Sequence, residues 1–428
     1  MQEAPGGPRR RVLAYCLYDF GNSAFTTIIV TGVYSVYFRA HVAGGGRSAD
    51  LLWGLSISAA MILAAILTPV LGARADRMGT RHRYLIGFTL LSIGATAALA
   101  RVGPGEVAAG VLLFILADVG YAGGESFYNA FLPDVADPAR LGFISGLAWG
   151  VGYFGGLLSL GLAGWILVGG SAPGGPPPAA YAALFAVVAA QYLLFTSPAL
   201  FLLRDRRGPA PSGETALRRL RRTASEVRRF RQVVRFLAAY FLYDNGISVV
   251  IAFTSIYLVT TLGFSMRDNL LLLAVLQISS AAGAFVSGLW ADRHGARRTV
   301  LASLLLWVGV LTAMAAVRSR ASFVALALVG GLGIGSTQAC SRTLLAHIVP
   351  ESKRAEFFGF FAFCTKASGI LGPPLFGALS RWSGNQRLAL LSVLFFFAAG
   401  LILLALVDEA EGRRVAGEYI ESALPGRP

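Results

Sequence analysis

The chain has 428 residues, of which 55% are hydrophobic and only 14% are charged, whereas soluble domains carry about 25% charged residues. This composition argues against a water-soluble enzyme and excludes a disordered chain, and three cysteines exclude a disulfide scaffold. The net charge of +15 comes almost entirely from arginines in short gaps between apolar runs, which is typical of membrane loops and not of a nucleic-acid-binding domain. We therefore expect a polytopic membrane protein without a cofactor, a metal site or a catalytic constellation.

Runs of about 20 apolar residues, the length that a bilayer crossing requires, predict the transmembrane helices. In chain order, twelve runs lie at 12–38, 51–73, 84–101, 106–132, 141–168, 179–203, 236–261, 269–291, 299–317, 321–347, 357–379 and 386–407. The first run exceeds the apolar region of a signal peptide, about 7–15 residues, and it contains Asp19. We expect this run to remain in the protein as a membrane helix.

The distribution of Lys and Arg predicts the orientation. With the N-terminus inside, the cytoplasmic segments hold 27 of these residues and the outside loops hold 8. Both termini are therefore expected in the cytoplasm, and we expect the protein to reside in a bacterial inner membrane. The polar stretch 204–235 contains 11 arginines and apolar residues near helical spacing, which predicts a basic amphipathic helix on the anionic inner leaflet.

Three sequence patterns occur twice, at offsets of 225, 216 and 217 residues. One of them, Leu-Tyr-Asp-Phe-Gly at 17–21, returns as Leu-Tyr-Asp-Asn-Gly at 242–246. A duplicated six-helix unit predicts an all-α membrane protein of two pseudo-symmetric halves. The expected domains are the halves 1–203 and 236–407, the cytoplasmic linker 204–235 between them, and the cytoplasmic tail 408–428.

The loop Gly72-Ala-Arg-Ala-Asp76-Arg77-Met-Gly79-Thr-Arg81 resembles the signature between helices 2 and 3 of the major facilitator superfamily. A degenerate copy containing Gly288, Asp292 and Arg293 lies where that fold has its second copy, between helices 8 and 9. The resemblance implies a secondary transporter of twelve helices, in which these two loops gate the cytoplasmic side and do not contact substrate.

A narrower resemblance rests on Tyr18-Asp-Phe-Gly-Asn-Ser-Ala-Phe25, on Phe127-Tyr-Asn-Ala-Phe-Leu-Pro133 and on Ser145-Gly-Leu-Ala-Trp-Gly-Val-Gly-Tyr153. These segments are similar to the vacuole-effluxer-like branch of the superfamily. That branch includes a fungal autophagy-associated effluxer linked to the release of amino acids from vacuoles, so the resemblance suggests amino acids as substrates.

Six ionisable residues lie inside the predicted spans, although each costs about 2.5–3.5 kcal/mol at the centre of a membrane helix. They are Asp19, Asp118, Glu125, Asp244, Arg342 and Lys366. The polar residues Asn22, Asn129 and Gln338 share their helical faces. Four acids cannot all be neutralised by two bases, which favours roles in binding substrate or carrying protons. The alternative is a set of internal salt bridges that holds the cytoplasmic side closed.

These features together favour a monomeric secondary active transporter that works by alternating access. It would move a small polar or zwitterionic solute, such as an amino acid or a derivative, coupled to protons. Two alternatives stay open, namely an exporter or flippase of an amphiphile such as a lysolipid, and a membrane sensor or scaffold that does not transport.

Overall fold

The computed structural model describes residues 8–135, 141–169, 176–205, 230–317, 319–350 and 354–423, and every regular element within these ranges is a helix. The first predicted span is interrupted. It begins as α1 (Pro8–Ala24), continues as the π-helical η1 (Phe25–Gly32), and ends through α2 (Tyr34–Tyr37) and η2 (Phe38–Val42). The prediction of an all-helical fold is confirmed.

The remaining helices follow the predicted spans, with two exceptions: a short helix begins at the last residue of the span 106–132, and another lies in the predicted tail. They are α3 (Ala49–Met78), α4 (Arg81–Leu99), α5 (Val107–Asn129), α6 (Leu132–Val135), α7 (Leu141–Val168), α8 (Pro178–Leu202), α10 (Arg231–Thr260), α11 (Met266–His294), α12 (Ala296–Ala316), α13 (Arg320–Ile348), α14 (Arg354–Ser383), α15 (Gln386–Ala405) and α16 (Glu409–Ala423). Within the described ranges, nine helices are long and apolar enough to cross a membrane. The segments predicted at 12–38, 84–101 and 357–379 are helical but are not among these nine. Twelve crossings therefore stay a prediction.

The described chain forms two compact units. Unit 1 comprises the described residues of Met1–Gly213, Ile251–Gln277 and Pro373–Gln386, and unit 2 comprises those of Glu214–Val250, Ile278–Gly372 and Arg387–Pro428. Most of the predicted linker, 206–229, and the end of the predicted tail, 424–428, lie outside the described residues. The domain boundaries expected from the sequence remain a prediction.

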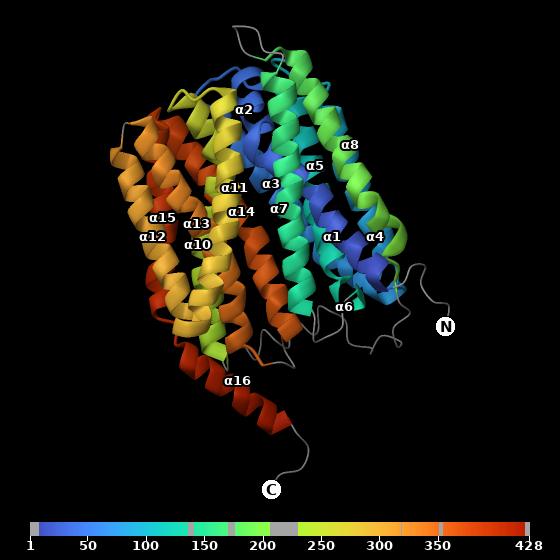
Figure 1. Cartoon of the computed structure of the whole chain (residues 1–428), viewed down its shortest axis with the longest axis vertical. Helices are drawn as coiled ribbons and strands as arrows, with labels where there is room; N and C mark the ends of the chain where they lie inside the picture. Colours follow the sequence, from blue (N-terminus) through green and yellow to red (C-terminus); the bar gives the residue numbers. More distant parts are fainter. Residues whose placement is uncertain are drawn as a thin grey trace. The chain divides into compact units, whose positions relative to one another are not determined.

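Glycines bring the helices into backbone contact within each unit. In unit 1, α1 packs against α7 and α8, while α4 packs along α5 (Figure 1). A side chain at Gly155 of α7 would overlap the carbonyl oxygen of Phe20 on α1. In unit 2, where α12 packs on α13, a side chain at Gly335 of α13 would overlap the carbonyl oxygen of Ser280 on α11. Small residues at such positions let membrane helices approach closely.

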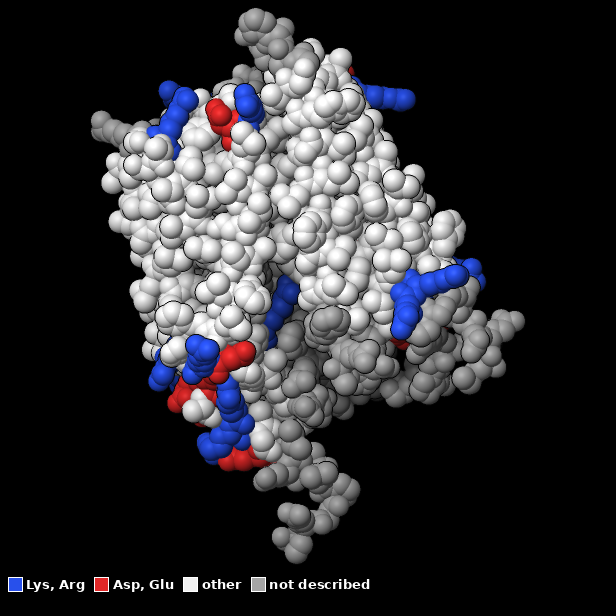
Figure 2. Space-filling model, viewed as in Figure 1, with Lys and Arg blue, Asp and Glu red and all other residues white. Residues whose placement is uncertain are grey.

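Large apolar side chains point outward from the helices of both units. They include Trp165 and Trp382, which are 75% and 82% exposed, and also Phe154, Phe201, Phe285 and Ile402. In Figure 2 most of the surface along the helices is white, and the blue and red side chains gather mainly near helix ends and around α16. An apolar band of this kind faces lipid and not water.

The glycine contact at α1 yields a prediction for stability. Gly155→Ala should destabilise the protein by about 1–3 kcal/mol, because the added methyl group must displace the α1 backbone. Gly150, on the same helix, has no neighbour within 4 Å of an added side-chain carbon, so Gly150→Ala is the matched control. Thermal unfolding of the purified variants measures both effects. Equal melting temperatures for the two variants would contradict the close contact.

Candidate functional site

Three acidic residues of unit 1 lie within electrostatic range of one tyrosine. Asp19 lies on α1, and Asp118 and Glu125 lie on α5. All three carboxylates are within electrostatic range of Tyr121. Asp118 is buried, whereas Asp19 and Glu125 are half-buried. The structure therefore brings together residues that the sequence places on two separate predicted helices.

A stack of tyrosines lies beside these acids. The ring of Tyr128 stacks on both Tyr15 and Tyr18, with centroid distances of 4.1 and 4.4 Å. Its hydroxyl donates to the Tyr15 carbonyl oxygen at 2.9 Å, and the Tyr18 hydroxyl is hydrogen-bonded to Thr89 Oγ1 at 2.9 Å. The stack fixes α1 against α5 and thereby sets the position of Asp19.

The two predicted amides of unit 1 lie in different surroundings. Asn22, one helical turn after Asp19, is only 3% exposed. Asn129 is the last residue of α5, and its side chain is exposed. A role for either residue in binding substrate stays a prediction.

In unit 2 the central group is Asp244, which is 2% exposed. The Ser368 hydroxyl of α14 donates to its Oδ2 atom at 2.6 Å. Tyr240 and Gln338 also hydrogen-bond to this carboxylate, and Arg342 lies within its electrostatic range. Three predicted site residues, Asp244, Gln338 and Arg342, thus share one cluster built from α10, α13 and α14.

Two residues of α14 differ in their relation to this cluster. Lys366, the remaining predicted base, is half-buried next to Thr365, whose hydroxyl is hydrogen-bonded to that of Tyr240 at 2.8 Å. Ser368 was missed by the sequence analysis, because one serine in an apolar helix gives no signal that it meets a carboxylate 124 residues away.

The duplicated motif forms a similar framework in each unit but places its aspartate differently. Tyr15-Cys-Leu-Tyr18-Asp19 corresponds to Tyr240-Phe-Leu-Tyr243-Asp244. Tyr18 and Tyr243 are both fully buried, and the Tyr243 hydroxyl is hydrogen-bonded to Ser341 Oγ at 2.7 Å. Asp244 is buried among donors, whereas Asp19 is half-buried. The tyrosines could have been found from this repeat, because they recur with the aspartates at the same spacing.

Each of the two predicted gating loops contains a glycine with a positive φ angle. Gly79 ends α3 with φ +60°, and Gly295 precedes α12 with φ +91°, a region that favours glycine. In the first loop, Arg81 Nη1 lies 4.0 Å from the Asp134 carboxylate. The side chains of Asp76 and Arg77 lie outside the described residues.

The other predicted gating residues are not closely packed. Gly72 and Gly288 have no neighbour within 4 Å of an added side-chain carbon, and Asp292 and Arg293 are exposed. Open positions of this kind are compatible with a gating role, which stays a prediction.

A carboxylate caps the helix that follows each of these loops. In unit 1 the backbone N–H of His82, at the start of α4, donates to Asp205 Oδ2 at 3.1 Å. In unit 2 the backbone N–H of Arg297, at the start of α12, donates to Glu409 Oε2 at 3.0 Å. Helix N-termini carry partial positive charge and favour such anions.

Glu409 has further partners at its other oxygen. Arg413 Nη2 lies 2.6 Å and His347 Nδ1 lies 3.2 Å from Glu409 Oε1. Burial acts to raise the pKa of Glu409, but the hydrogen bonds from Arg297, Arg413 and His347 outweigh it and lower the pKa below the ordinary value of 4.5. The ionised carboxylate therefore stabilises the folded protein.

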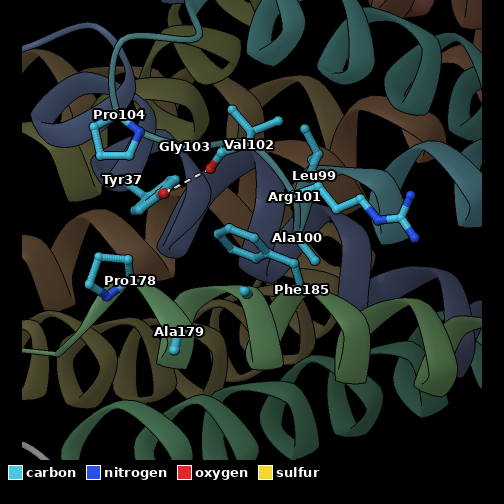
Figure 3. A pocket seen from close by; sticks show the side chains of 11 residues that line it. Tyr37, Leu99, Ala100, Arg101, Val102, Gly103, Pro104, Pro178, Ala179 and Phe185 are labelled. Carbon is cyan, nitrogen blue, oxygen red and sulfur yellow. Dashed lines mark hydrogen bonds between the residues drawn. The ribbon is translucent and has the colours of Figure 1, made fainter.

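A pocket in unit 1 is separate from these clusters. It has a volume of about 230 Å³ and lies between Tyr37, the loop after α4 and the start of α8 (Figure 3). The Tyr37 hydroxyl donates to the Val102 carbonyl oxygen at 2.9 Å, and the Arg101 guanidinium points away from the cavity (Figure 3). The residues that line it do not include any of the predicted site residues.

Comparison with known proteins identifies the family. The family described as "Vacuole effluxer Atg22 like" matches residues 51–141 and 139–417. The chain belongs to this family. This vacuole-effluxer-like protein is 27% identical over 404 residues to the "Uncharacterized MFS-type transporter YxiO" of Bacillus subtilis (strain 168), a match that covers 92% of this chain and 94% of that one.

A fungal relative matches over a shorter region. "Autophagy-related protein 22-1" of Aspergillus niger is 27% identical over 263 residues, or 55% of this chain. The match spans only 43% of the fungal protein. Its activity is therefore not transferred as a whole to this vacuole-effluxer-like chain.

Solved structures establish the fold. A D-xylose–proton symporter superposes with a TM-score of 0.74 at 16% identity, over 94% of this chain and 99% of that one. The nucleoside transporter NupG superposes with a TM-score of 0.68 at 14% identity, over 93% and 98%. These superpositions show the major facilitator fold, and the family, the Bacillus subtilis homologue and the structural neighbours of this multi-pass membrane protein are transporters, not enzymes.

The cap at Glu409 yields a prediction with a defined pH window. Glu409→Gln should cost about 1 kcal/mol of stability at pH 7, because it removes the charged cap of α12. The wild-type advantage is present above the ordinary pKa of 4.5 and is lost as the pH falls through the lower pKa of the folded state. Melting temperatures of wild type and variant should therefore converge in acid.

The control is Glu418→Gln on the same helix. Glu418 forms an exposed pair with Arg414 and should contribute little. A pH-independent difference between wild type and Glu409→Gln, or an equal loss in Glu418→Gln, would contradict the capping role.

Proposed function

We propose that this transporter moves a small zwitterionic or polar solute, an amino acid or an amino-acid derivative, by proton-coupled alternating access. The observation that carries the proposal is the cluster of unit 2, in which the buried carboxylate of Asp244 lies within electrostatic range of Arg342. An amino acid presents one ammonium and one carboxylate. Its ammonium can bind Asp244, while Arg342 or Lys366 receives its carboxylate.

The surroundings of Asp244 suit a residue that gains and loses a proton. A hydroxyl group can donate a hydrogen bond to an ionised carboxylate and accept one from a protonated carboxylic acid. Ser368 and Tyr240 supply two such hydroxyls at Asp244. Either protonation state can therefore keep its hydrogen bonds inside the membrane, as a proton carrier requires.

Unit 1 offers a second set of carboxylates for the same function. Asp19, Asp118 and Glu125 lie around Tyr121. Asp19 is the counterpart of Asp244 in the duplicated unit and is the more exposed of the two. We propose that Asp19 is the acid of this set that contacts the solute or a coupling proton.

The relatives and the charge distribution support this reading in general terms. One structural neighbour is a D-xylose–proton symporter, so the fold is compatible with proton coupling. The excess of Lys and Arg in alternate loops supports cytoplasmic termini in a bacterial inner membrane, next to an anionic inner leaflet. We propose a monomer as the functional unit.

Uptake into proteoliposomes tests the proposal. Radiolabelled amino acids should accumulate when the outside is acidic, and Asp244→Asn should lower proton-driven accumulation by about tenfold or more. Ser368→Ala should weaken it less, because Tyr240 and Gln338 remain. Asp19→Asn should also lower it.

The control for these variants is Asp268→Asn. Asp268 is exposed and its carboxylate contacts Ser265 just before its own helix, so its loss should leave accumulation unchanged. Full pH-dependent uptake in both Asp19→Asn and Asp244→Asn would refute proton coupling through these residues.

A further inference from the structure

A buried ion pair at the other end of α3 from Gly79 is separate from the sites described above. Asp50, in the first turn of α3, is only 2% exposed. Its Oδ1 atom accepts a hydrogen bond from Arg39 Nε at 2.7 Å. Its Oδ2 atom accepts from Ser380 Oγ at 2.5 Å and from Gln386 Nε2 at 2.7 Å. Both carboxylate oxygens are therefore hydrogen-bonded.

The partners of Asp50 join both sequence repeats. Arg39 and Asp50 come from the first repeat, whereas Ser380 and Gln386 come from the second, 330 and 336 residues later. The Oε1 atom of Gln386 in turn accepts hydrogen bonds from the hydroxyls of residues 260 and 261, the threonines at the end of α10. All of these residues belong to unit 1.

The backbones are also in contact around this cluster. A side-chain carbon at Gly377 of α14 would lie 2.5 Å from the Asp50 carbonyl oxygen. Trp53 Nε1, one turn along α3, donates to the Ala252 carbonyl oxygen of α10 at 3.0 Å. The start of α3 thus packs directly against α10 and α14, and Asp50 is the charged residue at the centre of this contact.

Alternating access requires such a contact to break. In transporters built from two repeats, the substrate path opens to one side when the repeats separate at that side. Arg39 and Asp50 both belong to the first repeat, so a separation of the repeats keeps this pair but removes the hydrogen bonds from Ser380 and Gln386. A carboxylate that loses two buried donors is left without partners until water replaces them, which favours the closed arrangement. The side chain of Arg39 is 19% exposed and can turn to water, whereas Asp50 cannot without an opening of the helices.

We propose that Asp50 is the latch of the outer side, a positioning residue that Arg39 orients and whose hydrogen bonds to Ser380 and Gln386 hold the path closed to the outside. The inference rests on the proposed function for alternating access and for the orientation with both termini in the cytoplasm, and it does not depend on the solute or on protons. The α3 helix carries this latch at one end and the signature loop at its other end, about 45 Å away at 1.5 Å per residue.

Thiol accessibility tests the latch without any substrate. Ser255 on α10 is fully buried within unit 1, one turn from Ala252, and Ser255→Cys places a thiol there. In intact cells, a membrane-impermeant maleimide should label this cysteine slowly. Adding Asp50→Asn should raise the labelling rate about threefold to tenfold, because loss of the charge shifts the population towards outward-open states. The parent with its native Cys16, Cys340 and Cys364 gives the background.

Two further variants keep the test decisive. Asp268→Asn, which removes an exposed acid from the first turn of α11 in the same unit, should leave the labelling rate unchanged. Gln386→Leu retains the Arg39–Asp50 pair but removes the hydrogen bond from α15, so it should raise the labelling rate less than Asp50→Asn. If Asp50→Asn does not fold, Gln386→Leu tests the latch in its place. Unchanged labelling in folded Asp50→Asn or Gln386→Leu, or an equal rise in Asp268→Asn, would overturn the latch. Failed amino-acid uptake with increased labelling would refute only the proposed solute.

Discussion

A carboxylate that leaves water must find donors within the protein, and this requirement organises the polar interior of both units. Asp244 obtains its donors from α10, α13 and α14, and Asp50 obtains its own from η2, α14 and α15. In each case one acidic side chain joins at least three helical segments, and some of its partners lie 124 or 330 residues away. A change in its partners is therefore a change in helix packing, which is the physical basis on which a transporter can link chemistry to movement.

The two copies of the duplicated motif keep the same arrangement of buried tyrosines but place their aspartates differently. Both copies keep a buried tyrosine hydrogen-bonded to a small hydroxyl, Tyr18 to Thr89 and Tyr243 to Ser341. The aspartates that follow differ, because Asp244 is buried among donors and Asp19 is half-buried. Two copies with a common framework and different acids allow the halves to divide the tasks of holding a solute and handling a charge.

Much of the fold could be predicted from the sequence, because bilayer length and the repeated motifs determine which segments are helical. The sequence analysis named Asp244, Gln338 and Arg342 as site residues on two predicted helices, and the structure shows that they share one cluster. The contacts of Asp50 and Ser368 could not be predicted. Helical spacing shows which side a residue occupies but not which helix meets it. A partner of Asp50 lies 336 residues away, and that of Ser368 lies 124 residues away. The π-helical turns of η1 also left no sequence signal, because its eight residues include no proline or charge that would mark an interruption.

The capping carboxylates have a consequence for biosynthesis. Asp205 lies 123 residues after the α4 turn that it caps, and Glu409 lies 112 residues after the α12 turn. Each of these acids follows within a few residues of the sixth predicted span of its repeat. While the ribosome is still making α8, the start of α4 lacks this anion, and the same is true of α12 until α15 has been made. The last few residues of each repeat thus complete the N-terminal cap of a helix that was synthesised much earlier.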